Sequence, residues 1–320
     1  MPRLKNTPTF SLITVKELHP TFGAEILGVD FSKPVENDVF QEIMAAIVKY
    51  GVCVFRNAQL DDQRHVEFAA KFGELDDVTP YVSGSRPHRL PFVELFDVGN
   101  IDLDGSVFAL DNIRQAFNKG NSLFHVDSSF NPRRAGYSLL RAHELPPNGT
   151  GGNTEFADTR TAFNDLPEDL KKRLLEKDYV AAHSLWHSRK VASPKALKDV
   201  NPSDSGFGRH KLVQMHEPSA RMNLYIASHI HHIEGLEENE SKELFDRLYE
   251  HAQQPSYVLS VEWQHNGDLI LWDNTAVMHR ATGGSFEGKF ERDMRRATVH
   301  DESSYAWGLN KKTNVRQGFP

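Results

Sequence analysis

Residues 124–130, with the sequence FHVDSSF, place a histidine and an aspartate two positions apart. In an extended segment the side chains at positions i and i+2 point to the same face, so His125 and Asp127 would project together. Two ionisable groups directed into an interior carry a large desolvation cost unless a partner offsets it. A metal cation is one such partner, and a third ligand elsewhere in the chain would sharpen this interpretation.

The segment WDNTAVMHRA, residues 272–281, supplies a candidate third ligand in His279, which lies on a predicted strand. Two histidines and one carboxylate on one face of a metal leave coordination positions open, as in mononuclear non-haem Fe(II) oxygenases. Those positions suit a bidentate co-substrate and dioxygen. Three protein ligands plus water also suit zinc, so a zinc-type hydrolase is an alternative. The chain contains 16 histidines, and a chance pair that is hydrogen-bonded within a polar strand is a further alternative.

The segment RDMRRATVHD, residues 292–301, follows and contains the candidate residues Arg292 and Arg296. Arginine is permanently charged, and its planar fork binds carboxylates through two hydrogen bonds. Beside an iron site, one such fork would anchor the distal carboxylate of a keto diacid. The alternative reading of Arg292 and Arg296 is a basic strand on the protein surface.

The rest of the chain must supply the elements that position these side chains, and its patterns predict many short strands and a few helices. Helical spacing of apolar residues predicts helices, and short apolar runs bounded by turn residues predict strands. The predicted helices cover residues 36–50, 61–73, 159–177 and 238–252, the third having its regular part after Pro167. The predicted strands cover residues 51–57, 92–98, 137–145, 154–158, 257–263, 268–273, 275–281 and 295–301.

This pattern predicts a mainly β fold, a β-sandwich or jelly roll with helical additions. The Asn-Gly pair at 266–267 lies between two apolar runs and indicates a hairpin. We expect a single domain over residues 1–320. Residues 187–210 are polar and contain two prolines, so we expect them to form a mobile insertion or lid.

Composition restricts the classes of partner. The net charge is −7 with acidic and basic residues interspersed, which argues against nucleic acid or an anionic membrane as the main partner. The single cysteine, Cys53, lies in an apolar run and is interpreted as a buried thiol. The amino-terminal residues show no apolar signal region, and no apolar run approaches the roughly 20 residues that span a bilayer. We therefore expect a cytoplasmic protein.

Other histidines offer a competing metal site. The segment SHIHHIEG, residues 228–235, would direct His229 and His231 to the same face if it were a strand. Such lone clusters carry a high risk of false positives, and the alternative is an exposed strand end. His183 and His187 are four residues apart but have no carboxylate nearby in the sequence, so we interpret them as the surface of a helix or lid.

Taken in order, several motifs resemble one known family. The chain carries, in this order, the motifs His-x-Asp, GGNTEFADT, LWDNxxxxHRA and RDxRRAT. The motifs and their order resemble those of the Fe(II)/2-oxoglutarate-dependent dioxygenases that include taurine dioxygenase and 2,4-dichlorophenoxyacetate dioxygenase. The amino-terminal pieces HPTFGAEILGVDFS and YGVCVFRNAQLDDQRHVEFAAKFGEL match as well. The resemblance runs from about residue 19 to residue 301. The resemblance is stronger to the chlorophenoxyacetate branch of the family, because the motifs HVDSSF, GGNTEFAD and RRAT match that branch.

The resemblance implies a double-stranded β-helix, which is a form of jelly roll, with Fe(II) as cofactor and 2-oxoglutarate as co-substrate. It implies that a small anionic substrate, a carboxylate or sulfonate, is hydroxylated with O2 while succinate and CO2 are released, and it leads us to expect a homo-oligomer. A catalytically inactive jelly-roll binding protein is the remaining alternative. The residues that carry over are the iron ligands His125, Asp127 and His279, the 2-oxoglutarate contacts Arg292, Thr154 and Asn121, and the substrate contacts Arg296 and Tyr81.

The chain departs from the chlorophenoxyacetate enzymes at two positions of the substrate pocket. The lysines that those enzymes carry are replaced here by Tyr81, or a neighbour of it, and by Ser106. The aryl-acid pocket is thus altered, and the resemblance predicts the class of reaction rather than the identity of the substrate.

Overall fold

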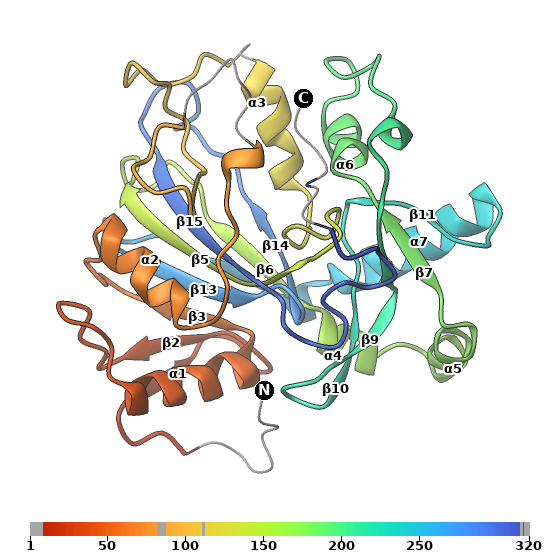
Figure 1. The fold of residues 1–320 in the computed structure, drawn as a ribbon, viewed down its shortest axis with the longest axis horizontal. Coiled ribbons are helices and arrows are strands. Elements are labelled where there is room, and N and C mark those ends of the chain that lie inside the picture. The colour runs from red at the N-terminus through yellow and green to blue at the C-terminus, as the bar shows by residue number, and fades with distance from the viewer. Residues whose placement is uncertain (1–8, 82–87, 111–112, 314–315, 317–320) are drawn as a thin grey trace.

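The computed structural model describes residues 9–81, 88–110, 113–313 and 316. Its strands pair into one large sheet and three smaller ones, and helices cover the outer faces (Figure 1). The strands are β1 Thr14–Glu17, β2 Ala24–Leu27, β3 Val52–Phe55, β4 Leu95–Asp97, β5 Ala135–Glu144, β6 Thr154–Asp158, β7 Val180–His183, β8 Gly208–Lys211, β9 Val213–His216, β10 Arg221–Leu224, β11 Ile230–Ile233, β12 Val258–Val261, β13 Leu269–Asp273, β14 Val277–Ala281 and β15 Asp293–His300.

The helical segments of the described residues are seven α-helices and four 3-10 turns. The α-helices are α1 Asn37–Tyr50, α2 Asp62–Ala70, α3 Ile113–Asn118, α4 Thr159–Asn164, α5 Glu168–Lys177, α6 Leu185–Ala192 and α7 Glu238–Ala252. The 3-10 turns are η1 Thr79–Tyr81, η2 Lys119–Ser122, η3 Pro202–Ser205 and η4 Pro255–Tyr257. None of the helices in the described residues combines the length and the apolar character that crossing a membrane requires.

The large sheet has seven strands in the order β1-β2-β3-β13-β5-β15-β4. A second sheet, in the order β12-β6-β14, is antiparallel throughout. Strand β13 shows how the layers form, because its successive side chains point to opposite faces. Leu269 and Leu271 pack into the helix-side core, whereas Ile270 and Trp272 pack into a core shared with Phe156 of β6. Two sheets packed face to face through such alternation make the jelly roll that the sequence predicts.

Helices α1 and α2 cover the outer face of the large sheet, on the red and orange side of Figure 1. Ile43 of α1 and Phe68 of α2 are buried in that core. Helix α1 ends at Gly51, whose φ of 70° is left-handed and suits glycine at a helix C-terminus. A Cβ there would lie 2.9 Å from the Arg160 guanidinium, so glycine also permits this close approach.

Several predicted elements differ from the structure in detail. The helix expected over 159–177 is two helices, because the chain turns at 165–167 and Pro167 caps α5. The strand expected over 92–98 is paired only at Leu95–Asp97. Cys53 is buried in β3, and burial raises the pKa of its thiol, in agreement with the prediction of a core residue.

Residues 187–210, expected to be a lid, contain most of α6, the turn η3 and the first part of β8. Helix α6 begins behind Ser184, whose hydroxyl accepts a hydrogen bond from the His187 amide in the manner of an N-cap. Strand β8 pairs with β7. The segment therefore begins in a helix and ends in a strand, with turns between them, and its role as a lid stays a prediction.

Candidate metal centre and its cavity

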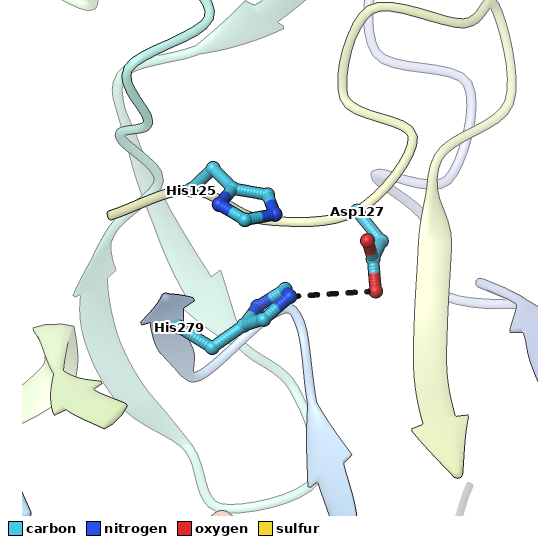
Figure 2. Close-up of side chains that lie close together, drawn as sticks. All are labelled: His125, Asp127 and His279. Carbon is cyan, nitrogen blue, oxygen red and sulfur yellow. Dashed lines mark ion pairs between the residues drawn. The ribbon is translucent and has the colours of Figure 1, made fainter. Parts of the chain in front are cut away.

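Three side chains from distant parts of the sequence meet between the sheets. Figure 2 shows His125, Asp127 and His279 directed toward one another. One ligand atom from each residue lies within 4.8 Å of those of the other two, and all three residues are buried. Within the described part of the chain, this is the one group of three such residues placed to hold a metal ion.

Backbone pairing brings the two histidines together. The His125 amide donates to the His279 carbonyl at 2.9 Å, and the His279 amide donates to the His125 carbonyl at 2.8 Å. On its other edge, β14 pairs with β6, which places His279 opposite Phe156. His279 is therefore held by its own hydrogen bonds to His125 on one side and by the pairing of its strand with β6 on the other.

Residues 124–130 do not form the extended strand that we expected from the spacing of His125 and Asp127. Only His125 takes part in a bridge, and the chain turns from Asp127 onward, with Ser128 at a φ of 56°. The Asp127 amide donates to Oδ1 of Asn274 at 3.0 Å, a bond that replaces strand pairing. His125 and Asp127 still point to one place, but the turn and Asn274 rather than a pleated strand direct the carboxylate.

Both histidines are neutral at pH 7, as metal binding requires. Burial lowers the pKa of His125 to about 4 and holds the pKa of His279 well below its usual range. Nδ1 of His125 lies 2.8 Å from the Leu123 carbonyl, which can only accept, so Nδ1 carries the proton and Nε2 keeps its lone pair. Nε2 of His279 lies 3.8 Å from Oδ2 of Asp127 (Figure 2).

The carboxylate of Asp127 is anionic and held at both oxygens. Burial alone would raise its pKa, but the charge of Arg296 and the hydrogen bond from Ser138 act against burial, and the pKa is lowered. Oδ1 accepts a hydrogen bond from Nη1 of Arg296 at 2.7 Å, and Oδ2 accepts one from the Ser138 hydroxyl at 2.7 Å. A buried carboxylate between two neutral imidazoles is a donor set that fits a divalent cation such as Fe(II).

A cavity of about 100 Å³ opens beside this group. Its wall includes the three candidate ligands and every other site residue named from the sequence, which are Tyr81, Asn121, Thr154, Arg292 and Arg296. The structure thus brings together all eight positions. Their individual roles stay predictions.

Arg292 and Thr154 both line the cavity, and each has a hydrogen-bond donor that is not used by the described residues. Nη2 of Arg292 donates to the Gly152 carbonyl at 3.0 Å, whereas its buried Nε has no hydrogen-bond partner among the described residues. The Thr154 hydroxyl oxygen accepts from Nε1 of Trp263 at 3.1 Å, so its hydrogen remains free to donate. Burial lowers the pKa of Arg292 to about 10, which leaves it cationic at neutral pH.

Asn121 and Tyr81 lie on other parts of the wall. Oδ1 of Asn121 accepts a hydrogen bond from Nη2 of Arg189 at 2.8 Å. The Tyr81 hydroxyl lies 3.3 Å from a carboxylate oxygen of Asp76, and its ring packs edge-on against Phe96. Burial raises the pKa of Tyr81, so the phenol stays protonated.

Two further wall residues, Arg189 and His229, were not assigned to the site from the sequence. His229 is buried and packs against the His125 ring at 5.4 Å, so the interpretation of residues 228–235 as an exposed strand end is wrong for this histidine. It holds for His231, which is exposed. His229 precedes β11, and its Nδ1 lies 2.8 Å from the Ser188 hydroxyl of α6.

His183 is also buried, so its interpretation as a surface residue is wrong. It ends β7, the middle strand of the sheet β11-β7-β8, and its Nδ1 lies 3.0 Å from the Ser129 hydroxyl. The i, i+4 spacing of His183 and His187 suggested one helix, but α6 begins between them at Leu185.

Comparisons with known proteins agree with this geometry. Residues 14–298 match the family model described as "Taurine catabolism dioxygenase TauD, TfdA family". The chain is 35% identical to the alpha-ketoglutarate-dependent 2,4-dichlorophenoxyacetate dioxygenase of Burkholderia sp. (strain RASC), covering 90% of this chain and 94% of that protein. It is 32% identical to the (S)-phenoxypropionate/alpha-ketoglutarate-dioxygenase of Sphingobium herbicidovorans, covering 84% of this chain and 88% of that protein.

A solved structure gives the same result for the fold. The crystal structure of AAD-2 in complex with Mn(II) and N-oxalylglycine superimposes with a TM-score of 0.82 at 34% identity. The match covers 92% of this chain and 100% of that chain. The likeness therefore extends over nearly the whole chain.

Proposed function

Because this chain belongs to the taurine catabolism dioxygenase TauD, TfdA family and is an Fe(II)- and 2-oxoglutarate-dependent dioxygenase, we propose that it hydroxylates a small carboxylate or sulfonate in the cavity described above. The observation that carries this proposal is the position of the His-Asp-His group in a cavity whose wall also holds arginines. A metal held by this group would face a cavity whose wall also carries anion-binding side chains.

We assign the Fe(II) to His125, Asp127 and His279, which supply two neutral imidazoles and one carboxylate. When bound, the iron and 2-oxoglutarate supply the oxidising power that turns O2 and substrate into hydroxylated product, succinate and CO2. The chain's own part is to hold the ligands and to keep the reacting groups out of bulk water. Ser138 supports this by binding Oδ2 of Asp127 at 2.7 Å.

We assign the distal carboxylate of 2-oxoglutarate to Arg292 and Thr154. Both line the cavity, and each has an unused hydrogen-bond donor there. A guanidinium and a hydroxyl can bind the two oxygens of one carboxylate. Asn121 also lines the cavity and is assigned to the neighbourhood of the co-substrate.

We assign the acidic group of the prime substrate to Arg296, and the lining of its pocket to Tyr81. Arg296 already binds Asp127 through Nη1, while its buried Nε has no partner in the described residues. Apolar side chains, among them Phe96, Phe130 and Leu185, complete the wall. An organic acid or sulfate ester with an aryl or alkyl body matches this combination, and the substrates named for the relatives are of that kind.

A zinc-type hydrolase or an inactive binding protein would use the same three ligands. Neither has a need for the buried pair of Arg292 and Thr154 beside the metal group, and the relatives are named as dioxygenases. We carry four further predictions as proposals: a single domain over 1–320, a lid at 187–210, a homo-oligomer and a cytoplasmic location. Closure of the lid is tested by protease protection of residues 187–210, and unchanged cleavage with substrate bound would count against it.

The direct test is succinate release from 2-oxoglutarate with Fe(II) and O2, across a panel of aryloxy acids, sulfonates and alkyl sulfates. At least one anion should stimulate succinate release above the rate without substrate, and His125→Ala or Asp127→Ala should abolish it. Succinate release that survives both substitutions would show that the metal group is assigned wrongly. A protein that releases no succinate under any of these conditions would contradict the proposed function.

A further inference from the structure

A third guanidinium reaches the cavity from a different wall. Arg189 lies on α6, whereas Arg296 lies on β15 of the large sheet, and both line the same cavity. The function proposed above uses Arg292 for the co-substrate and Arg296 for the substrate. It gives Arg189 no role.

The hydrogen bonds of Arg189 are incomplete. Its Nη2 donates to Oδ1 of Asn121 at 2.8 Å. Its Nε and Nη1 are shielded from solvent and have no hydrogen-bond partner in the part of the chain that the structure describes. Leaving charged donors buried and unpaired is costly, so a site that does this is suited to a ligand that accepts from them.

The carboxylates of the cavity wall are paired with arginines other than Arg189. They belong to Asp76 and Asp127. Asp76 binds Arg316 at 2.7 Å, and Asp127 binds Arg296 at 2.7 Å. Burial, followed by repulsion from Arg296, lowers the pKa of Arg189 to about 10, so it is still cationic at neutral pH. Two neighbouring cations favour an anion between them.

The neighbouring turn is shaped around this guanidinium. A Cβ at Gly120 of η2 would lie 2.3 Å from Nη1 and 2.6 Å from Cδ of Arg189. Next to it, Phe117 of α3 packs edge-on against Trp186 of α6, with ring centroids 5.3 Å apart. The absence of a side chain at Gly120 leaves room for the Arg189 guanidinium, and the contact between Phe117 and Trp186 holds helix α6 in place.

We propose that Arg189 is a second anchor for the prime substrate, binding its oxyanion together with Arg296. This inference rests on the proposed function and narrows it. The substrate carries a carboxylate, sulfonate or sulfate ester that is held between β15 and α6, and its neutral analogues are poor substrates. Arg189 thereby makes α6 part of the substrate site and sets the specificity for anions.

The kinetic test compares Arg189→Gln with Lys190→Gln. The control removes a positive charge one residue away, from a side chain that binds the Val200 carbonyl and does not line the cavity. The probes are 2,4-dichlorophenoxyacetate, hexyl sulfate and the neutral methyl ester of the first. We expect Arg189→Gln to lower kcat/KM for the two anions about 10- to 100-fold, the effect of losing one or two charge-assisted hydrogen bonds. The KM for 2-oxoglutarate and the rate with the ester should stay within about twofold, and Arg189→Lys should recover part of the loss.

A binding test separates this inference from the proposed function. Isothermal titration of the metal-free protein with the same two anions measures affinity without turnover. Wild-type and Lys190→Gln protein should bind, Arg189→Gln should bind at least about tenfold more weakly, and Gly120→Ala should weaken binding by displacing an intact guanidinium. Binding without any succinate release would contradict the proposed function and leave the anion anchor standing.

Three results would overturn the anchor. One is equal anion affinity in Arg189→Gln and Lys190→Gln. Another is a wild-type protein that binds neither anion. The third is an equal loss for the anions, the ester and 2-oxoglutarate in Arg189→Gln, which would show that Arg189 only braces α6 against η2 through Asn121.

Discussion

His125 and His279 exchange two backbone hydrogen bonds, of 2.9 and 2.8 Å, and so form one rung of an antiparallel ladder. Their ring centroids lie 4.3 Å apart. Residues that share such a rung keep their side chains adjacent whether or not a ligand is present. The ladder, rather than the metal, therefore sets the spacing of the two imidazoles.

A group that is formed before the metal arrives should be stabilised by it through mass action. At a concentration about 100 times its Kd, a ligand that binds only the folded state adds about 2.7 kcal/mol to the free energy of unfolding. We expect Mn(II) to raise the melting temperature of the wild-type protein by several degrees. It should leave that of Asp127→Ala unchanged, and an equal shift in both proteins, measured by calorimetry, would argue for a metal site elsewhere.

Ser138 should matter for metal affinity because it binds Oδ2 of Asp127. Removing a hydrogen bond to a metal ligand typically lowers affinity about 10- to 100-fold. We expect Ser138→Ala to weaken Mn(II) binding by about that factor in equilibrium dialysis. Ser129→Ala is the matched control, because this buried serine binds His183 instead of a candidate ligand. Equal affinities in the two variants would remove Ser138 from the account.

Arg292→Gln should raise the KM for 2-oxoglutarate by about 10- to 100-fold, since it removes the charge that is assigned to the distal carboxylate. The affinity for Mn(II) should change little. Arg280→Gln serves as the control, because it removes a cation from β14 that pairs with Glu155 and does not line the cavity. Should both variants keep the wild-type KM, the co-substrate must bind elsewhere on the wall.

The stability of the fold should fall in mild acid because of buried neutral histidines such as His65. Burial, and next the nearby Arg141, lower the pKa of His65 to about 3. Between its ordinary pKa of 6.5 and that value, the unfolded chain takes up a proton that the folded chain does not. The free energy of unfolding therefore decreases as the pH falls through this range, by up to about 1.4 kcal/mol per pH unit for this one residue.

Urea unfolding from pH 7 to pH 4 measures this dependence. In His65→Gln the free energy of unfolding should decrease less than in the wild type, because one proton fewer is taken up on unfolding. A slope that is identical in the two proteins would show that His65 is protonated in the folded state over this range.

Local pattern was enough to predict much of the fold. The strand over 154–158 and the helix over 238–252 have the predicted bounds, because each follows a strong local pattern between turn residues. The break within 159–177 depends instead on how residues 165–167 turn between two helices. Propensity and periodicity do not report such tertiary choices.

The site divides in the same way. His125, Asp127 and His279 could be named because their residue types restrict the chemistry, and the family resemblance supplied Arg292 and Thr154. Arg189 was not named from the sequence, and His229 was named only for a competing metal site, because nothing in their local sequence shows that they reach this cavity. They reach the cavity only through the packing of α6 and of the segment before β11, which are long-range contacts.

The most direct test of the central claim is the number of divalent ions bound per chain, measured by anaerobic equilibrium dialysis with Fe(II) for the wild type and for His125→Ala, Asp127→Ala and His279→Ala. One ion should bind per wild-type chain, and each variant should lose at least about 100-fold in affinity, because each substitution removes one of three ligands. No bound ion in the wild type, or wild-type affinity in all three variants, would show that these residues do not form the metal site.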